Sequence, residues 1–173
     1  MVEIERLIRD IPDFPEKGII FKDISPLLAD GPALGRAISA MAKPYANAEI
    51  ERVVGIESRG FIFGMGIALS LGCGFVPVRK PGKLPGDVVG IDYSLEYGSD
   101  RLEIQADALV GQPRVLVVDD LLATGGTAAA TAQLVTQAGG DLVGFAFVIE
   151  LKGLGGRTVL PKDLSVESLL AYD

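Results

Sequence analysis

The chain has 173 residues, 49% of them hydrophobic and 23% charged, a composition typical of one globular domain of ordinary size. Its formal net charge of −7 disfavours binding to a nucleic-acid backbone, because that affinity depends on Lys and Arg side chains that neutralise phosphates. There is no histidine and a single cysteine, Cys73, which excludes Ser-His-Asp and Cys-His catalysis, an internal disulfide and a cysteine-rich metal site, and favours a cytoplasmic location.

The first 30 residues do not show the alternation of strand and helix that follows them. Residues 1–6 are charged and predict a short amphipathic helix, with no sign of a signal peptide. Prolines at positions 12 and 15 precede a short predicted strand at residues 18–22. We therefore expect one domain that consists of an N-terminal hood, residues 1–30, and an α/β core, residues 31–173.

Strands and helices alternate along most of the core. Asp30 and Pro32 predict the start of a helix, which ends before Pro44. Strands are then predicted at residues 52–56, 75–78, 114–118 and 142–149, and helices at residues 60–71 and 127–138. This alternation predicts an α/β fold with a doubly wound parallel sheet.

Residues 61–78 carry no charge, and such a run approaches the ~18 residues that indicate a membrane helix. Glycines at positions 64, 66, 72 and 74 and a proline at position 77 interrupt it. We interpret the run as a buried helix followed by a buried strand, and we expect no membrane association.

Residues 79–98 interrupt the alternation with several glycines and two prolines. A loop of this length inside a compact domain is often a functional lid, and a solvated connector is the alternative. We predict a lid loop over residues 79–98.

The most informative stretch is residues 115–127, where an apolar strand leads into Asp119 and Asp120 and then into a glycine-rich turn before a helix. Backbone N–H groups at a helix N-terminus bind phosphate, and Gly125 and Gly126 would let the backbone approach the anion. The carboxylates suit sugar hydroxyls, or Mg²⁺ held through water. The pattern predicts a sugar-phosphate site, whereas a capped helix beside solvated acids is the alternative.

Cations are few in this acidic chain, and their grouping is therefore informative. Arg59 follows the predicted strand 52–56, and the tight basic cluster is made up of Arg79, Lys80 and Lys83. Such cations could bind a pyrophosphate and neutralise charge that develops on a leaving group. Surface ion pairs and a solvated basic face are the alternatives.

Several segments together resemble the adenine phosphoribosyltransferases of the type I phosphoribosyltransferase family, in the family's order and over nearly the whole chain. The segments are residues 14–15, 18–26, 57–61, 79–85, 93–98 and 115–127. The resemblance implies the type I phosphoribosyltransferase fold with a hood and a catalytic lid loop. It also implies a homodimer that converts adenine and 5-phosphoribosyl-1-pyrophosphate (PRPP) to AMP and pyrophosphate with Mg²⁺. The ion would be held by PRPP, with no direct protein ligand.

By the same resemblance, three of these segments, residues 57–61, 79–85 and 115–127, would bind PRPP. Asp119 and Asp120 would bind the ribose hydroxyls. The pyrophosphate would contact Arg59, Arg79, Lys80 and Lys83, some of them across the dimer interface. The 5′-phosphate loop would be Ala123, Thr124, Gly125, Gly126 and Thr127.

The resemblance also assigns the adenine site and the acid-base residue. Phe21 and Leu121 would sandwich the base, whose edge would be read by the carbonyl of Ile20 and the amide of Lys22. Ordinary core packing is the alternative for Phe21. Glu96 would manage the base proton and Tyr97 would close with it, although a surface Glu is otherwise the commoner role.

Two other functions are weighed beside adenine transfer. One is a phosphoribosyltransferase for a 6-oxopurine such as xanthine or hypoxanthine. The other is a PRPP-sensing regulator that binds nucleic acid, which the net charge of −7 disfavours.

Overall fold

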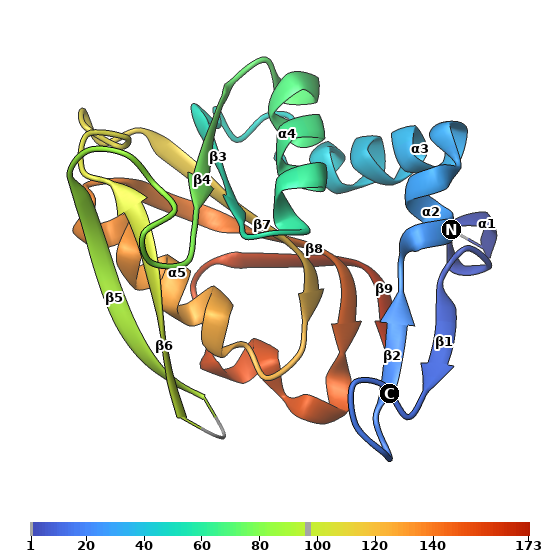
Figure 1. The fold of residues 1–173 in the computed structure, drawn as a ribbon. Coiled ribbons are helices and arrows are strands. Elements are labelled where there is room, and N and C mark those ends of the chain that lie inside the picture. The colour runs from blue at the N-terminus through green and yellow to red at the C-terminus, as the bar shows by residue number, and fades with distance from the viewer. Residues whose placement is uncertain (1, 96–97) are drawn as a thin grey trace.

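The structure, a computed structural model, describes residues 2–95 and 98–173. Its centre is a parallel sheet of five strands in the order β4-β3-β7-β8-β9 (Figure 1). These strands are β3 (Arg52–Ile56), β4 (Gly74–Val78), β7 (Arg114–Leu122), β8 (Asp141–Leu151) and β9 (Ser165–Tyr172). The predicted α/β fold with a parallel sheet is confirmed.

Helices cover both faces of this sheet. The α-helices of the core are α3 (Gly31–Ala42), α4 (Gly60–Leu71) and α5 (Gly126–Gln137), and α3 and α4 lie on the opposite face from α5 (Figure 1). Successive residues of β7 alternate between the two faces, so that Leu116 and Val118 pack with α3 and α4, whereas Val115 and Val117 pack with α5. The result is a hydrophobic core on each side of β7.

The N-terminal segment forms a small unit beside β9. It consists of α1 (Val2–Glu5), the antiparallel pair β1 (Arg9–Pro12) and β2 (Ile20–Asp23), and α2 (Ser25–Ala29). The strand β1 was not predicted, because most of its residues are exposed and show no apolar alternation. Ion pairs between side chains of β1 and β2 hold the two strands together, at 2.6 Å for Arg9–Asp23 and 2.7 Å for Lys22–Asp10.

The predicted lid loop at residues 79–98 is not a loop in the second half of that range. Residues from Val88 onward form β5 (Val88–Leu95), which pairs antiparallel with β6 (Gly98–Gln105). Val89, Ile91 and Tyr93 pack at the edge of the core on the α5 side, and this period of two is the strand signal that the neighbouring glycines obscured. The hairpin lies against α5 (Figure 1).

Short 3-10 turns complete the chain: η1 (Lys43–Tyr45), η2 (Lys152–Leu154) and η3 (Gly156–Val159). The strand β9 was also missed, since it is an edge strand that lies beyond the last predicted element. Among the described residues, no helix is long and apolar enough to cross a membrane.

Candidate active site

The carboxyl ends of β3 and β7 and the start of α5 enclose a cavity of about 260 Å³. This is the edge of a parallel sheet at which ligands bind in α/β folds. The cavity is lined by Glu57, Ser58, Arg59, Lys80, Asp119, Asp120, Leu121, Leu122, Ala123, Thr124, Gly125, Gly126, Thr127 and Ala128. The fold thus brings the predicted phosphate loop, both acids and two of the predicted cations to one place.

The loop of residues 123–127 leads from β7 into α5. Gly125 occupies the N-cap position with a φ of +81°, a left-handed conformation that glycine adopts readily. Because glycine has no side chain to cap the helix, the first backbone N–H groups of α5 are left for a ligand, beside the positive end of the helix dipole. The loop can therefore bind an anion such as a phosphate.

The acids do not follow the strand, as the predicted end at residue 118 implied, but lie within β7. The pairing of β7 with β8 continues past them, with Asp119 opposite Phe147 and Leu121 opposite Ile149. Asp120 is 5% exposed, and Asp119 is partly exposed. Burial raises the pKa of both carboxyls, and the pKa of Asp119 is raised further by the neighbouring charge of Asp120.

Arg59 partly offsets this unfavourable charge. Its Nε lies 2.9 Å from Asp120 Oδ2. The next residue, Gly60, begins α4 so close to β7 that a Cβ there would lie 2.7 Å from the carbonyl oxygen of Val118. A side chain at position 60 would push Arg59 away from the acid, so the ion pair depends on this glycine.

The guanidinium of Arg59 also reaches the hood. Its Cζ lies 5.2 Å from the ring centroid of Phe21, a cation–π distance. The proposed adenine-sandwich residue Phe21 is thus coupled through Arg59 to the acid pair. Leu121 lines the cavity itself.

Glu57 is a site residue that sequence reasoning did not assign. Its carboxylate accepts hydrogen bonds from Arg79 Nε at 3.2 Å and from the backbone N–H of Lys80 at 2.9 Å. Burial opposes the charged form, but the hydrogen bonds from Arg79 and Lys80 outweigh it and lower the pKa of Glu57. Its position in the Glu57-Ser58-Arg59-Gly60 motif was the available signal.

Tyr93 and Asp100, also unassigned from sequence, join the hairpin to the site. Lys80 Nζ pairs with Asp100 and lies 3.3 Å from Tyr93 Oη. The same hydroxyl lies 3.4 Å from Oγ1 of Thr127. The hairpin is therefore connected both to a predicted pyrophosphate residue and to the phosphate loop.

The other predicted residues lie farther from the cavity or outside the described ranges. Among the described residues, the cavity lining does not include Arg79, Lys83, Ile20, Phe21 or Lys22. Arg79 NH1 donates to the carbonyl of Lys83 at 3.2 Å. Glu96 and Tyr97, the predicted catalytic pair, lie outside the described residues.

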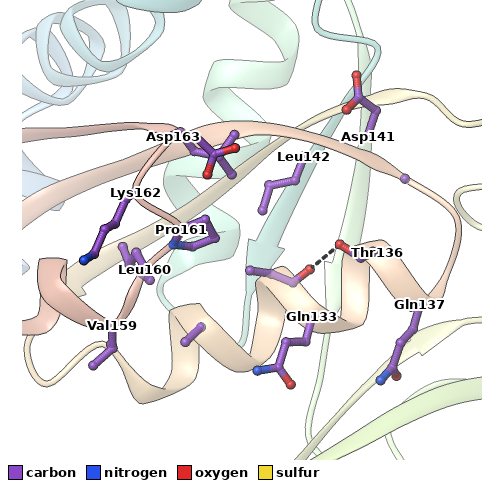
Figure 2. Close-up of a pocket in the computed structure, with 14 residues that line it drawn as sticks. Gln133, Thr136, Gln137, Asp141, Leu142, Val159, Leu160, Pro161, Lys162 and Asp163 are labelled. Atoms are coloured by element: carbon purple, nitrogen blue, oxygen red, sulfur yellow. Dashed lines mark hydrogen bonds between the residues drawn. The ribbon is translucent and has the colours of Figure 1, made fainter.

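A larger groove of about 830 Å³ lies between α5 and residues 159–164 (Figure 2). Its lining includes Ala129 in the first turn of α5 and Asp141 and Leu142 at the start of β8, so it runs along α5 to the amino end of that strand. Although this groove is larger, it is not the candidate site. In the part of the chain that the structure describes, none of the predicted site residues lines it.

Known proteins resemble this chain over nearly its whole length. A family profile described as phosphoribosyl transferase domain matches residues 27–167. The adenine phosphoribosyltransferase of Synechococcus sp. (strain CC9902) is 74% identical over 99% of this chain and 98% of the relative. The crystal structure of adenine phosphoribosyltransferase from Rhodothermus marinus superimposes with a TM-score of 0.94 at 51% identity, covering 99% of this chain and 97% of that one.

The crystal structure of adenine phosphoribosyltransferase from Saccharomyces cerevisiae superimposes with a TM-score of 0.90 at 42% identity, over 98% of this chain and 97% of that one. Its structure was solved in complex with adenine and D-2,5-dideoxy-2,5-imino-altritol 1,6-bisphosphate.

The raised pKa of Asp119 predicts how an isosteric substitution changes stability. A carboxyl whose pKa is higher in the folded than in the unfolded state destabilises the fold when it is charged. This loss of stability grows as the pH rises above the pKa that the carboxyl has in the unfolded chain. Asp119→Asn removes the charge and keeps an oxygen that can accept from the N–H of Asp120, a bond of 2.9 Å. At pH 7 the free energy of unfolding should therefore rise by roughly 1.4 kcal/mol for each unit of pKa shift, with little change below pH 4.

Urea unfolding at pH 7 and at pH 3.5 measures this difference. Asp120→Asn is the control, since it leaves Arg59 without its partner and should gain less stability. A loss of stability in Asp119→Asn at pH 7 would show that the charge of Asp119 is compensated in the fold.

Proposed function

This chain belongs to the adenine phosphoribosyltransferases of the type I phosphoribosyltransferase family, and from that membership we infer that it converts adenine and PRPP to AMP and pyrophosphate in purine salvage. The observation that carries the inference is the single cavity in which the N-terminus of α5, the acid pair and Arg59 meet. A phosphate, two vicinal hydroxyls and a pyrophosphate are the groups that these residue types recognise.

In the proposed complex, the 5′-phosphate of PRPP binds the backbone of residues 123–127 at the start of α5. Asp119 and Asp120 accept hydrogen bonds from the ribose hydroxyls. Arg59 and Lys80 line the same cavity and contact the pyrophosphate, joined by Arg79 and Lys83. The yeast relative, solved with a bisphosphate imino-sugar alcohol and adenine, supports a site of this composition.

The base would lie between Phe21 and Leu121. The proximity of Phe21 to Arg59 supports this placement, because Arg59 itself contacts the acid pair. The exocyclic amine of adenine would donate to the carbonyl of Ile20, and the amide of Lys22 would donate to a ring nitrogen. Both groups belong to β2, whose backbone holds them at a fixed spacing.

The transfer proceeds by loosening the bond between C1′ and the pyrophosphate oxygen, which leaves an oxocarbenium-like carbon. N9 of adenine then bonds to C1′ from the opposite face, with inversion, and the electron pair of the broken bond leaves with pyrophosphate. The cations of the site stabilise the charge that develops on the leaving oxygen. Glu96 holds or moves the proton of the base, and lid closure excludes water that would hydrolyse the sugar.

We expect Mg²⁺ to arrive with PRPP. Within residues 2–95 and 98–173, no group of three or more His, Cys, Asp or Glu side chains is arranged to hold a metal ion. The paired carboxylates at the cavity suit an ion that is bound to PRPP oxygens and reached through water. When bound, the ion would neutralise charge on the pyrophosphate. A cytoplasmic location completes the proposal.

Base selectivity is the direct test of the reaction. Pyrophosphate release is measured with PRPP, Mg²⁺ and adenine, hypoxanthine, guanine or xanthine, and with no base as the control. A 6-oxo group faces the carbonyl of Ile20 with no proton to donate, and an unpaired buried polar group costs about 1–3 kcal/mol. Adenine should therefore be preferred by roughly tenfold or more in kcat/KM. Equal turnover of hypoxanthine contradicts backbone recognition at β2.

Glu96→Leu tests the acid-base assignment. Because the PRPP groups are bound elsewhere, the substitution should lower kcat by about 10²–10⁴-fold and leave the Kd for PRPP nearly unchanged. Glu96→Gln separates orientation from proton transfer, since the amide can donate a hydrogen bond but cannot carry the proton. Asp92→Ala, which removes a carboxylate of β5 four residues earlier in the chain, is the matched control. Wild-type kcat for Glu96→Leu in single-turnover measurements would refute the assignment.

We further propose that two copies of the chain associate through α4. Ile62, Met65 and Leu69 are 40%, 46% and 75% exposed, and their spacing places them on one face of the helix. The opposite face packs in the core through Phe63 and Ile67. A second copy seated on this apolar stripe would lie next to Arg59, which precedes the helix, and could supply cations that do not line the cavity of their own chain.

Met65→Glu should disrupt this interface, because it buries a charge at the centre of the stripe. Sedimentation equilibrium should give twice the chain mass of 18.2 kDa for the wild-type protein and one chain mass for the variant. Val110→Glu, at a residue that is 76% exposed outside α4, is the control and should remain a dimer. A dimeric Met65→Glu protein would place the interface elsewhere.

A further inference from the structure

The turn η3 lies directly behind the phosphate loop. A Cβ added to Gly156 would lie within 3.0 Å of both the carbonyl oxygen of Ala123 and the amide nitrogen of Gly125. A Cβ added to Gly125 would lie within 3.0 Å of the carbonyl oxygen of Gly156. These neighbours are backbone atoms, which cannot rotate aside as a side chain can. Two backbone segments about 30 residues apart in sequence therefore pack together without space for a methyl group.

An ion pair attaches this turn to the sheet. Arg157 binds Glu150 with both arms of the guanidinium, Nε to Oε1 at 3.0 Å and NH2 to Oε2 at 2.5 Å. Its NH1 donates to the carbonyl of Val166 in β9 at 2.5 Å. Arg157 thus connects η3 to two neighbouring strands of the central sheet.

The carboxylate of Glu150 is buried and hydrogen-bonded, which suits it to hold Arg157. It is 7% exposed, and its Oε2 also accepts from Ser168 Oγ at 2.9 Å. The hydrogen bond from Arg157 is the main reason that the pKa of Glu150 is lowered, so the pair stays charged at neutral pH. An ion pair with two hydrogen bonds and a buried carboxylate restrains its backbone more than a single surface contact does.

The loop requires such a support because it is built from glycines. Gly125 and Gly126 have large conformational freedom when unrestrained, and a backbone that binds phosphate has to be ordered first. On the far side, the hydroxyl of Thr127 lies 3.4 Å from that of Tyr93 in the hairpin. The backbone of η3 packs against the other side of the loop and supports it.

The geometry points to Gly156 as a positioning residue for the phosphate loop, with the ion pair Glu150–Arg157 holding it in place. None of these three residues lines the 260 Å³ cavity as the structure describes it, so they act through residues 123–125 and not on the ligand. They set the affinity for the 5′-phosphate group of the substrate. This inference rests on the proposed function for the identity of the ligand, but the loop itself can be tested with a simpler phosphate.

Gly156→Ala is the most direct variant, and ribose 5-phosphate is the probe. Calorimetry should show a Kd for ribose 5-phosphate at least tenfold above that of the wild-type protein, with the Kd for adenine within twofold. Gly153→Ala is the matched control, because position 153 lies in the adjoining turn η2 and a Cβ there would meet no atom closer than 3.9 Å. An unchanged Kd for ribose 5-phosphate in Gly156→Ala, or an equal rise in Gly153→Ala, would overturn the inference.

Arg157→Lys provides a second route if Gly156→Ala does not fold. Lysine keeps the charge but lacks the fork that binds both oxygens of Glu150. The KM for PRPP should rise several-fold while kcat at saturating PRPP stays within twofold, a split that general loss of folded protein would not produce. A lower kcat with an unchanged KM for PRPP would overturn the positioning role.

The two hypotheses fail in different ways. If the proposed reaction is wrong, the wild-type protein gives no pyrophosphate from PRPP and adenine, yet the effect of Gly156→Ala on ribose 5-phosphate still reports on the loop. If the positioning role is wrong, turnover by the wild-type protein is normal and the ribose 5-phosphate affinity does not respond to position 156.

Discussion

Two adjacent carboxylates at the end of a buried strand are the constraint on which this site depends. Asp119 and Asp120 belong to β7, the middle strand of the sheet, where burial raises the pKa of both groups. A fold selected for stability alone has no reason to place like charges there. The ion pair with Arg59 offsets part of the penalty, and it depends on the close approach of α4 to the sheet that Gly60 allows. The same guanidinium also lies at a cation–π distance from Phe21, so it contacts both the hood and the acids.

The residues around the cavity are held in place in two different ways. The acids and the phosphate loop belong to β7 and α5, which pack in the core on both faces of the sheet. The cations after β4 are instead held by ion pairs and hydrogen bonds, Arg79 to Glu57 and Lys80 to Asp100. Ion pairs in partly exposed positions exchange partners more easily than packed strands separate. The covalently reacting sugar would thus be held by the rigid part, and the leaving group by the part that can rearrange.

The sequence predicted the parallel sheet and its helices because their signals are local. The apolar run before Asp119 predicted a buried strand, and the capping Asp30 predicted the start of α3, where it accepts a hydrogen bond from the amide of Ala33 at 2.9 Å. The acids themselves were expected after the strand, since the apolar run ends at Val118. Their place within β7 follows from pairing with β8, which no local pattern encodes.

Side-chain pairing in the site was harder to predict for a related reason. Glu57 and Arg79 are 22 residues apart, and Lys80 and Asp100 are 20 apart, so each pair forms only once the topology is known. The family resemblance predicted that Arg79 and Lys80 contact a substrate, but it carried no information about Glu57 and Asp100, which pair with them in this structure.

The sequence does not show which glycines the fold requires. The chain has 22 glycines, and nothing in their spacing separates those that the fold needs from those that it tolerates. Gly31 and Gly35 have open space where a methyl group would lie, whereas a methyl group on Gly60 or Gly156 would meet backbone carbonyls of β7 or of the phosphate loop. The latter two set distances between elements, one at the acids and the other at the backbone amides that we propose bind the phosphate. The precision of the site therefore depends on residues without side chains as much as on the acids and cations that would touch a ligand.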